Sequence, residues 1–426
     1  MPAYLRPILS LLCGVGLLLL GSGLVNTLVS VRASALGYSS GLVGALTSAY
    51  FAGFFVGTFV APPLIRRIGH IRAFAFYSAC CTCTVLLHTL GDTAWLWLPA
   101  RLLLGLALVG MYTVIESWLN AQADPAHRGQ VFATYMVVNL GALTLAQQLL
   151  RLEGPHAFFA FVLVALLISS ASLPVLLTRQ PQPQLPPAPR LQLRRLFAAA
   201  PTSGAGALLS GLAMGAFWGL MPAYLTGRGL DAAAVGTVMS VAILGGALLQ
   251  WPIGRLSDRR DRRLVLAIVC LVAAAAALLS PLASDHRGAL LALVFVYGGM
   301  AFAIYPIVVA HLVDHLPPED LLAASGSALL LTGLGSALGP LAAGALMSAV
   351  GPEALFGWFA LLLGALAAYA AHRYRAFRRQ RPDAPHFLPM LRTSHASLDL
   401  IGEPREETDA NAGLRTADAP AQHDRS

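Results

Sequence analysis

The sequence predicts an all-α membrane protein with twelve transmembrane helices arranged as two pseudosymmetric six-helix bundles. Three observations lead to this fold class: twelve long apolar runs, a regular alternation of Arg-rich and Arg-poor connections, and an internal repeat with an offset of 192 positions. The first fixes the class of protein, the second its orientation, and the third its division into halves.

The composition excludes a soluble globular protein. The 426-residue chain is 57% hydrophobic and 11% charged, whereas soluble domains carry about 25% charged residues. All 28 basic residues are Arg, and they gather at the ends of apolar runs, so the net charge of +8 does not indicate nucleic-acid binding. The five cysteines lie in apolar runs, and Cys80-Cys-Thr-Cys83 has no His or acidic residue beside it. We therefore expect buried thiols and no metal site.

The apolar runs are long enough to cross a membrane, which takes about 20 mostly apolar residues. The first run exceeds the hydrophobic region of a signal peptide, about 7–15 residues, so we interpret it as the first span. The expected spans are 8–31, 40–64, 71–91, 95–118, 129–150, 156–178, 201–225, 231–253, 264–283, 288–313, 320–348 and 353–373.

The Arg residues predict the orientation. The connections after even-numbered spans, together with both termini, hold most of them, whereas the other connections hold only Arg32, Arg151, Arg228 and Arg287. Cytoplasmic loops carry the excess of basic residues, so both termini are expected in the cytoplasm. An odd number of spans would break this alternation.

The internal repeat predicts two halves. Two six-helix halves in parallel repeat are typical of one large group of secondary transporters. The aligned pairs include Gly37 and Gly229, Gly44 and Gly236, Ser48 and Ser240, Gly53 and Gly245, Arg67 and Arg259, and Gly141 and Gly333.

The expected domains follow from this repeat. Residues 1–178 form the N-terminal bundle and 201–373 the C-terminal bundle. Residues 179–200, rich in Pro and Arg, form a semi-rigid cytoplasmic linker. Residues 374–426 turn polar and are expected to be a disordered cytoplasmic tail near anionic lipid.

The most charged stretch of the chain is Gly254-Arg-Leu-Ser-Asp-Arg-Arg-Asp-Arg-Arg263, between the eighth and ninth spans. Seven ionisable side chains cannot lie in hydrocarbon, so a tight turn at the cytoplasmic surface is expected. The stretch resembles the signature loop of the major facilitator superfamily, Gly-x-Leu-x-Asp-Arg-x-Gly-Arg-Arg/Lys, with Asp261 in place of the second Gly. The resemblance implies the superfamily fold.

A second resemblance concerns the N-terminal half. Gly69-His-Ile-Arg-Ala-Phe74 and Val114-Ile-Glu-Ser-Trp-Leu-Asn120 are similar to the bacterial YcaD-type subgroup of the same superfamily. This resemblance implies a multi-pass protein of the bacterial cytoplasmic (inner) membrane, and it implies no particular substrate.

The signature loop suggests a conformational gate. In the superfamily the loop's Asp lies beside the N-terminus of a helix in the opposite half and helps to hold the outward-open state. The matching segment of the N-terminal half keeps Arg67 and Gly69 but has Arg66 where the other half has Asp258.

We therefore hypothesise that the C-terminal half supplies the only such gate. Its carboxylate would meet the helix dipole and the guanidinium at Arg128-Gly129, where the fifth span begins. The alternative is a loop that only fixes topology. The proposed gate residues in the C-terminal half are Gly254, Asp258, Arg259 and Arg262.

Three charged residues are candidates for coupling to protons. Arg101 opens Arg101-x-x-x-Gly105, which resembles the superfamily's fourth-helix motif, whose Arg has been linked to proton coupling. Glu116 is the deepest acid of the N-terminal half, and Asp314 ends the tenth span. A charge inside a span usually faces a cavity or a partner. The alternatives are that Arg101 reaches the outer head groups and that Glu116 forms an ion pair near the inner ones.

Glycine patterns in several spans predict close helix packing. They are Gly53-x3-Gly57, Gly211-x3-Gly215-x3-Gly219 and Gly335-x3-Gly339-Pro340. The last resembles an antiporter signature, but it lies in the eleventh span rather than the fifth, so a packing hinge is the preferred interpretation.

Polar and aromatic residues near the middle of the spans are candidates for lining a substrate route. Any one of them alone fits a packing role, and we expect only some of the group to face a cavity. The candidates are Asn26, Tyr50, Tyr112, Asn139, Gln147, Trp218, Gln250, Tyr297 and Tyr305.

These observations predict a secondary active transporter that takes up or exports a small organic solute. The resemblance implies that transport is coupled to protons. A strongly ionic substrate is disfavoured unless Arg101 faces inward. There is no Gly-x4-Gly-Lys-Ser/Thr loop and no Lys to make one, so no nucleotide cofactor is expected. The expected partners are the solute, membrane lipid and protons, with the chain a monomer. The alternatives are a non-transporting membrane receptor or assembly scaffold on the same fold and, with less support, a membrane-embedded enzyme.

Overall fold

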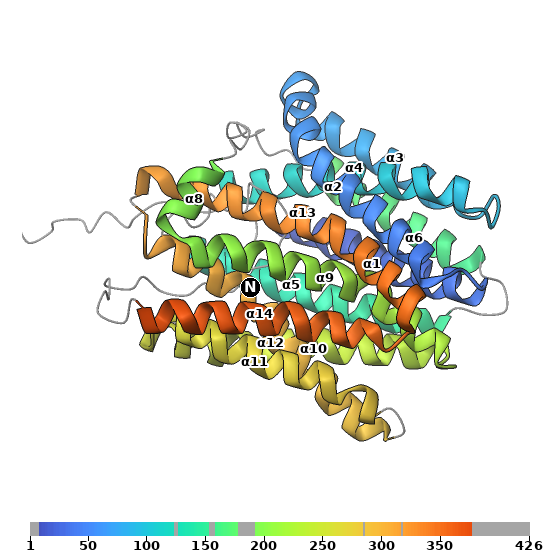
Figure 1. The fold of residues 1–426 in the computed structure, drawn as a ribbon. Coiled ribbons are helices and arrows are strands. Elements are labelled where there is room, and N and C mark those ends of the chain that lie inside the picture. Colours follow the sequence, from blue (N-terminus) through green and yellow to red (C-terminus); the bar gives the residue numbers. More distant parts are fainter. Residues whose placement is uncertain are drawn as a thin grey trace, which may run out of the picture.

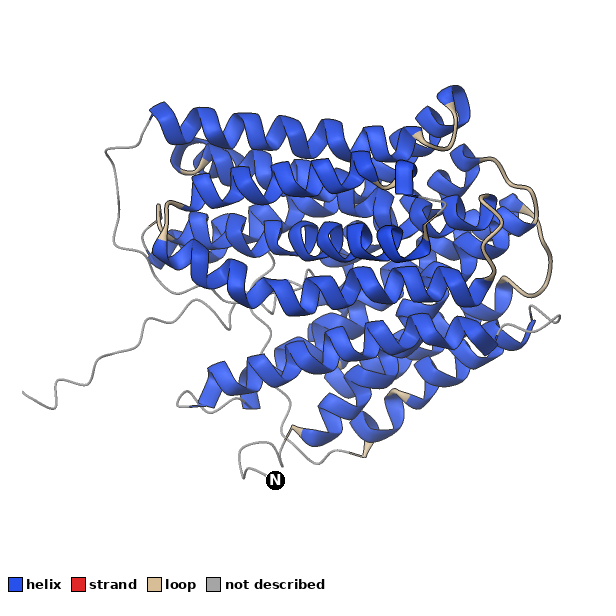
Figure 2. Cartoon of the chain, turned by 90° about the horizontal axis from the view of Figure 1, so that it is seen from below, coloured by secondary structure: helices blue, strands red, loops and turns tan. Residues whose placement is uncertain are grey.

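The structure is a computed structural model that describes residues 8–122, 127–152, 158–177, 192–283, 286–316 and 318–376. Within these ranges the chain forms helices joined by short connections, and no strand occurs (Figure 2). The helices are α1 (Leu9–Ala35), α2 (Ser40–Ile68), α3 (His70–Leu87), α4 (Ala94–Gln122), α5 (Arg128–Gln148), η3 (Leu149–Leu152), α6 (Phe158–Ser170), α7 (Ser172–Leu176), α8 (Leu193–Ala199), α9 (Pro201–Gly227), α10 (Ala232–Arg259), α11 (Arg262–Leu279), η4 (Pro281–Ala283), α12 (Arg287–Val313), α13 (Pro318–Val350) and α14 (Ala354–Ala376).

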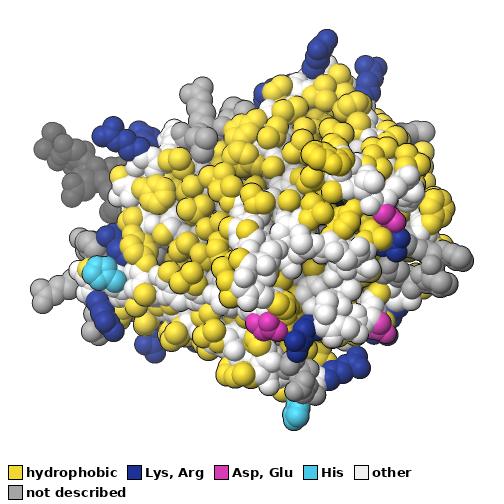
Figure 3. Space-filling view, turned by 45° about the vertical axis from the view of Figure 1, so that its right-hand side comes forward, with side chains coloured by type: hydrophobic (Ala, Val, Ile, Leu, Met, Phe, Trp, Pro, Cys, Tyr) yellow, Lys and Arg dark blue, Asp and Glu magenta, His cyan; other side chains and the backbone are white. Residues whose placement is uncertain are grey.

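The outer surface is that of a membrane protein. Among the described residues, twelve helical segments are long and apolar enough to cross a bilayer, which confirms the predicted class and number of spans. Large apolar side chains such as Leu248, Leu271 and Leu361 are more than 60% exposed. In Figure 3 apolar side chains cover most of the face in view, and the charged ones lie toward its margins.

The helices pack as two six-helix bundles, each with the same set of contacts. In the N-terminal half α2 packs on α4, α1 on α5, and α3 on both α4 and α6. In the C-terminal half α10 packs on α12, α9 on α13, and α11 on both α12 and α14. These are the same pairs when the helices of each half are counted from its beginning. The structure thus confirms the predicted pseudosymmetric fold.

The repeated glycines show the pseudosymmetry at the level of atoms. Gly37 and Gly229 turn the chain between the first and second spans of each half with φ of 76° and 84°, a region in which only glycine is unstrained. Gly53 of α2 leaves no room for a Cβ against the carbonyl of Leu102 in α4, and Gly245 of α10 has the same contact with Phe295 in α12. Small residues here allow backbones to touch.

Two further glycines of the repeat lie between the halves. A Cβ on Gly44 of α2 would overlap the carbonyl of Pro340 in α13, and one on Gly236 of α10 would overlap the carbonyl of Gln147 in α5. The glycines of α9 and α13 likewise touch the partner helix's backbone, at Gly215 and Gly339 for example, as expected for packing faces.

Among the described residues, the hydrogen bonds between the halves gather at one end of the bundle. We name the end that carries Arg67 and Arg259 the Arg-rich end, at the left of Figure 1, and the other the Arg-poor end. At the Arg-poor end the Gln148 amide donates to Ser240 Oγ at 2.6 Å and the Arg151 guanidinium donates to Thr237 Oγ1 at 2.9 Å. The Gly41 N–H also donates to Ser348 Oγ at 2.8 Å. Toward the Arg-rich end α2 rises away from α13 (Figure 1).

Several expected boundaries were wrong. The block from Gly254 to Arg263 is not one turn, because α10 continues to Arg259 and Asp261 already caps α11 through the Arg263 N–H at 2.9 Å. The second span also runs on to Ile68, and the third ends at Leu87 rather than 91. The charged ends of α2 and α10 extend beyond their apolar stretches. Hydropathy marks only the apolar stretch and so does not detect the helical turns that follow.

The sixth span comprises α6 and α7. Ala171 between them has helical angles and donates its N–H to the Leu167 carbonyl at 3.0 Å, so the two form one crossing, as expected. The expected linker contains a short helix, α8, which Arg195 joins to Asp320 of α13 by an ion pair. The Pro-rich part of that linker, most of the expected tail and the first seven residues lie outside the described ranges.

The glycine contacts inside each half predict a clear difference between two alanine variants. In Gly53→Ala the added methyl group meets backbone, so we expect a loss of about 1–3 kcal/mol. In Gly364→Ala the methyl group meets no atom within 4 Å, so stability is expected to hold or to rise by about 0.5–1 kcal/mol. Thermal denaturation midpoints in one detergent would test this; equal midpoints would contradict the close contact.

Candidate functional site

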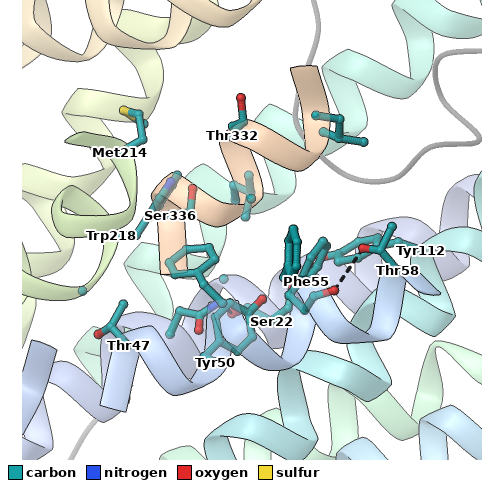
Figure 4. Close-up of a pocket in the computed structure, with 18 of the residues that line it drawn as sticks. Ser22, Thr47, Tyr50, Phe55, Thr58, Tyr112, Met214, Trp218, Thr332 and Ser336 are labelled. Carbon is teal, nitrogen blue, oxygen red and sulfur yellow. Dashed lines mark hydrogen bonds between the residues drawn. The ribbon is translucent and has the colours of Figure 1, made fainter. Parts of the chain in front are cut away.

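A cavity of about 210 Å³ lies between the two halves. Helices α1, α2, α4 and α5 of the N-terminal half and α9, α12 and α13 of the C-terminal half line it. Figure 4 shows part of this wall, with Tyr50 and Phe55 on α2, Trp218 on α9 and Thr332 on α13. The first helix of each half lines the cavity, so both halves meet any bound molecule.

A buried cation lies in the N-terminal wall. Arg101 of α4 is only 2% exposed, and its Nη2 donates to Asn26 Oδ1 of α1 at 2.7 Å. Its guanidinium carbon lies 4.5 Å from the centre of the Tyr50 ring, a cation–π contact. The side chain therefore faces the cavity rather than the head groups, and α1 and α2 hold it in place.

Other polar groups of this wall lie further along the cavity. The hydroxyls of Ser22 on α1 and Tyr112 on α4 are hydrogen bonded at 2.9 Å (Figure 4). Asn139 of α5 is fully buried and donates to the Tyr135 carbonyl at 2.9 Å.

The C-terminal wall is aromatic. Trp218 of α9 and Phe302 of α12 meet edge to face, with ring centres 5.7 Å apart. Tyr305 of α12 extends this wall. Among the described residues the lining contains one cation, Arg101, and no carboxylate. Aromatic side chains line both walls, so it is the cation that distinguishes the N-terminal wall from the C-terminal one.

The candidate cavity residues divide into two groups. Asn26, Tyr50, Tyr112, Asn139, Trp218 and Tyr305 line the cavity. Gln147, Gln250 and Tyr297 do not, and each ties helices together instead.

The contacts of the second group show what these side chains do. Gln147 accepts from Thr27 Oγ1 at 2.7 Å and so joins α5 to α1. Gln250 donates to the Phe302 carbonyl at 3.3 Å, joining α10 to α12. The ring of Tyr297 packs against Phe217.

The signature loop forms an ion-pair cluster within the C-terminal half. Arg262 is 2% exposed and donates to Asp314 at 2.6 Å, and it pairs with Asp258 at 3.3 Å. Asp314 lies just beyond the end of α12, where burial raises the pKa of its carboxyl and Arg262 acts against that rise. Arg262 thus joins the loop to the tenth span.

The other gate candidates occupy different environments. Gly254 is buried, whereas Arg259 and Arg67 are exposed. Gly69 ends α2 with φ of 85°. The side chain of Arg128 lies outside the described residues, and a Cβ on the neighbouring Gly129 would meet no atom within 4 Å. The predicted contact of Asp258 with this helix start stays a prediction.

Glu116 lies inside the N-terminal half and does not line the cavity. Its side chain is 1% exposed and accepts a hydrogen bond from the Tyr135 hydroxyl at 2.8 Å. On the next residue, Ser117 Oγ is 3.0 Å from His70 Nε2. The Glu116 carboxylate is thus buried and hydrogen bonded to a phenol.

Sequence reasoning missed the polar contacts that close the Arg-poor end. The sequence placed Gln148 in the fifth span and Arg151 in the connection after it and assigned neither a contact. In the structure both form hydrogen bonds to α10 of the other half. The one signal was the alignment of Ser48 with Ser240 in the repeat. In the part of the chain that the structure describes, no cluster of three or more His, Cys, Asp or Glu side chains suits a metal ion.

Comparison with known sequences gives consistent results. The model of the Major Facilitator Superfamily matches residues 11–202 and again 203–405. An uncharacterized MFS-type transporter of Yersinia pestis (strain Pestoides F) is 31% identical over 365 residues, covering 84% of this chain and 93% of that protein. The uncharacterized MFS-type transporter YcaD of Salmonella newport (strain SL254) is 31% identical over 363 residues, with the same coverage.

Solved structures share the fold. The nucleoside transporter NupG has a TM-score of 0.65 at 17% identity, covering 88% of this chain and 100% of that one. A bacterial homolog of the human lysosomal transporter Spinster, in an inward-facing and occupied conformation, has a TM-score of 0.68 at 16% identity, covering 90% of this chain and 98% of that one.

Proposed function

This chain belongs to the Major Facilitator Superfamily of transporters, and we propose that it moves a small organic solute across a bacterial inner membrane by alternating access to the cavity between its halves. The carrying observation is that one end of the interface is bonded and packed while the helices diverge at the other. This is the arrangement that a two-sided carrier needs in one of its states.

The orientation supports the assignment of that state. Because Arg-rich connections lie on the cytoplasmic side, the divergent end faces the cytoplasm and both termini lie there. The conformation is then inward-facing, with the Arg-poor end closed toward the outside. In the opposite state the Arg-rich ends would approach, and Asp258 with Arg259 would meet the start of α5 as the gate.

We further propose that protons drive the cycle through Glu116. Its carboxylate is buried and has a phenol partner, so its protonation changes the charge inside the N-terminal half. Arg101 and Asp314 are the other charged groups positioned to respond, one in the cavity and one at the Arg-rich end.

Distances between spin labels would test the alternation without a known substrate. One pair, Arg72→Cys with Arg260→Cys, reports the Arg-rich end, and a second, Thr93→Cys with Leu282→Cys, reports the Arg-poor end; all four positions are exposed. The five native cysteines are first replaced by alanine. We expect two populations in which one pair lengthens as the other shortens, with a balance that depends on pH and loses that dependence in Glu116→Gln.

A variant of the closed end provides the control. Gln148→Ala removes a hydrogen bond between the halves, which is worth about 1 kcal/mol, so the population with an open Arg-poor end should rise about fivefold. The Thr134 hydroxyl on the same helix bonds only within α5, so Thr134→Ala should leave the two populations unchanged. A single fixed distance for both pairs in every variant and at every pH would instead favour the non-transporting scaffold.

A further inference from the structure

We propose that the solute is an amphipathic carboxylate, with its carboxylate on Arg101 and its apolar body against the aromatic wall of Trp218, Phe302 and Tyr305. This inference rests on the proposed transport function and specifies its substrate class. It does not follow from the fold, because the structures that share the fold include a nucleoside transporter.

The charge of Arg101 has no counter-ion among the described residues. None of the ion pairs among the described residues includes Arg101, and no carboxylate lines the cavity. Its partners are neutral: the Asn26 amide at 2.7 Å, the Leu46 carbonyl at 3.5 Å and the Tyr50 ring. A buried guanidinium without an anion is costly inside a membrane, which is why such residues usually face a partner or a pathway.

One nitrogen of this guanidinium has no hydrogen-bond partner among the described residues. This nitrogen, Nη1, is buried, while Nη2 and Nε point to Asn26 and Leu46. Buried donors are nearly always satisfied, so an unpaired donor in a side chain that lines the cavity leaves a hydrogen bond that a ligand could complete. A planar carboxylate matches the fork of a guanidinium better than a single-point acceptor does.

Aromatic residues of the cavity lining constrain the rest of the ligand. Opposite the cation, Trp218 and Phe302 form an edge-to-face pair, and Phe51, Phe54 and Phe55 of α2 add further rings to the lining. A cationic ligand would be repelled by Arg101 and would find no carboxylate among the described lining residues to compensate. One anionic end and one apolar body therefore fit the two walls.

A matched set of probes tests the inference by binding to the full chain in lipid nanodiscs. The set is 3-phenylpropionate, 3-phenylpropionamide and 3-phenylpropylammonium, with propionate and dodecanoate to vary the apolar length and chloride as an inorganic anion. By calorimetry we expect an apolar carboxylate to bind at least about tenfold more tightly than its amide, as for a hydrogen bond to a charged group. The ammonium compound should not bind, and propionate and chloride should bind weakly.

Variants locate the site. Arg101→Gln should abolish the preference for carboxylate over amide, and Trp218→Leu should weaken the long carboxylates more than propionate. Arg228→Gln, which removes an exposed Arg paired with Glu353 outside the cavity, should leave the preference intact. If Arg101→Gln does not yield monodisperse protein, Arg101→Lys serves instead, and a reduced preference is expected because an ammonium binds at one point only.

Several outcomes would overturn the inference. They are equal binding of carboxylate and amide, stronger binding of the ammonium compound, displacement by chloride at equal concentration, no binding by any carboxylate, or a carboxylate preference that survives Arg101→Gln. None of these outcomes affects the spin-label experiment, in which the two distances could still alternate. A wrong substrate class is therefore distinguishable from a failure of alternating access.

Discussion

Replacing Arg262 by glutamine is expected to lower the free energy of unfolding by about 3–5 kcal/mol, the cost of leaving a buried charge without its partner. Arg262 and Asp314 have side chains 2% and 6% exposed, with their N and O atoms 2.6 Å apart. Glutamine would leave the Asp314 carboxylate buried beyond the end of α12. Denaturation midpoints would measure the loss, and Arg260→Gln, which changes an exposed side chain in the same turn, should show none.

The same variant should depend on pH in a defined sense. Burial raises the pKa of the Asp314 carboxyl above its ordinary value of 3.8, and Arg262 opposes the rise. Without Arg262 the folded-state pKa rises further, so the folded variant keeps a proton that the unfolded chain releases. Its stability then falls as pH increases through that window. The deficit should be smallest in acid and largest near neutrality, and Asp314→Asn in the same chain should restore most of it. A deficit independent of pH would contradict the buried ion pair.

Valine at both Gly44 and Gly236 is expected to reverse the preferred conformation. Each added side chain would overlap a carbonyl of the opposite half near the Arg-poor end. Overpacking costs about 1–3 kcal/mol per site, so the double variant should shift the balance by more than about tenfold toward an open Arg-poor end. The Thr93–Leu282 label pair should lengthen and the Arg72–Arg260 pair shorten.

The control for this reversal is Gly141→Val, because a Cβ there meets no atom within 4 Å. Each single variant should have an intermediate effect, since the two contacts are related by the pseudosymmetry. A double variant whose distance distributions match those of the unmodified chain would show that these contacts do not set the conformation.

The sequence was sufficient for the fold because its signals are of the kind that a membrane imposes. Twelve apolar runs exceed the length of a span, and the offset that aligns Gly37 with Gly229 also aligns two turns with the same positive φ. Helix ends were harder to predict. Hydropathy stops at the first charges, whereas α10 keeps its backbone bonds as far as Arg259.

The cavity was less predictable because depth in the membrane does not determine which side of a helix a residue occupies. Gln147 and Asn139 lie about two turns apart on the same helix, but only Asn139 lines the cavity, while Gln147 bonds Thr27 of α1. A helix that is apolar all round gives no direction for its polar residues. The depth of Arg101 alone was compatible with head groups or cavity, and its orientation followed only from the positions of Asn26 and Tyr50.

The described lining of the cavity has its one cation on the N-terminal half and Trp218 and Phe302 on the other half, and this placement has a pharmacological consequence. A molecule that touches both walls bridges the moving bodies, and its affinity depends on how closely they approach. A compound that binds Arg101 but does not reach Trp218 and Phe302 would occupy the cavity without drawing the C-terminal half toward it. Such compounds would act as inhibitors that are not transported, and lengthening their apolar part would convert them into substrates.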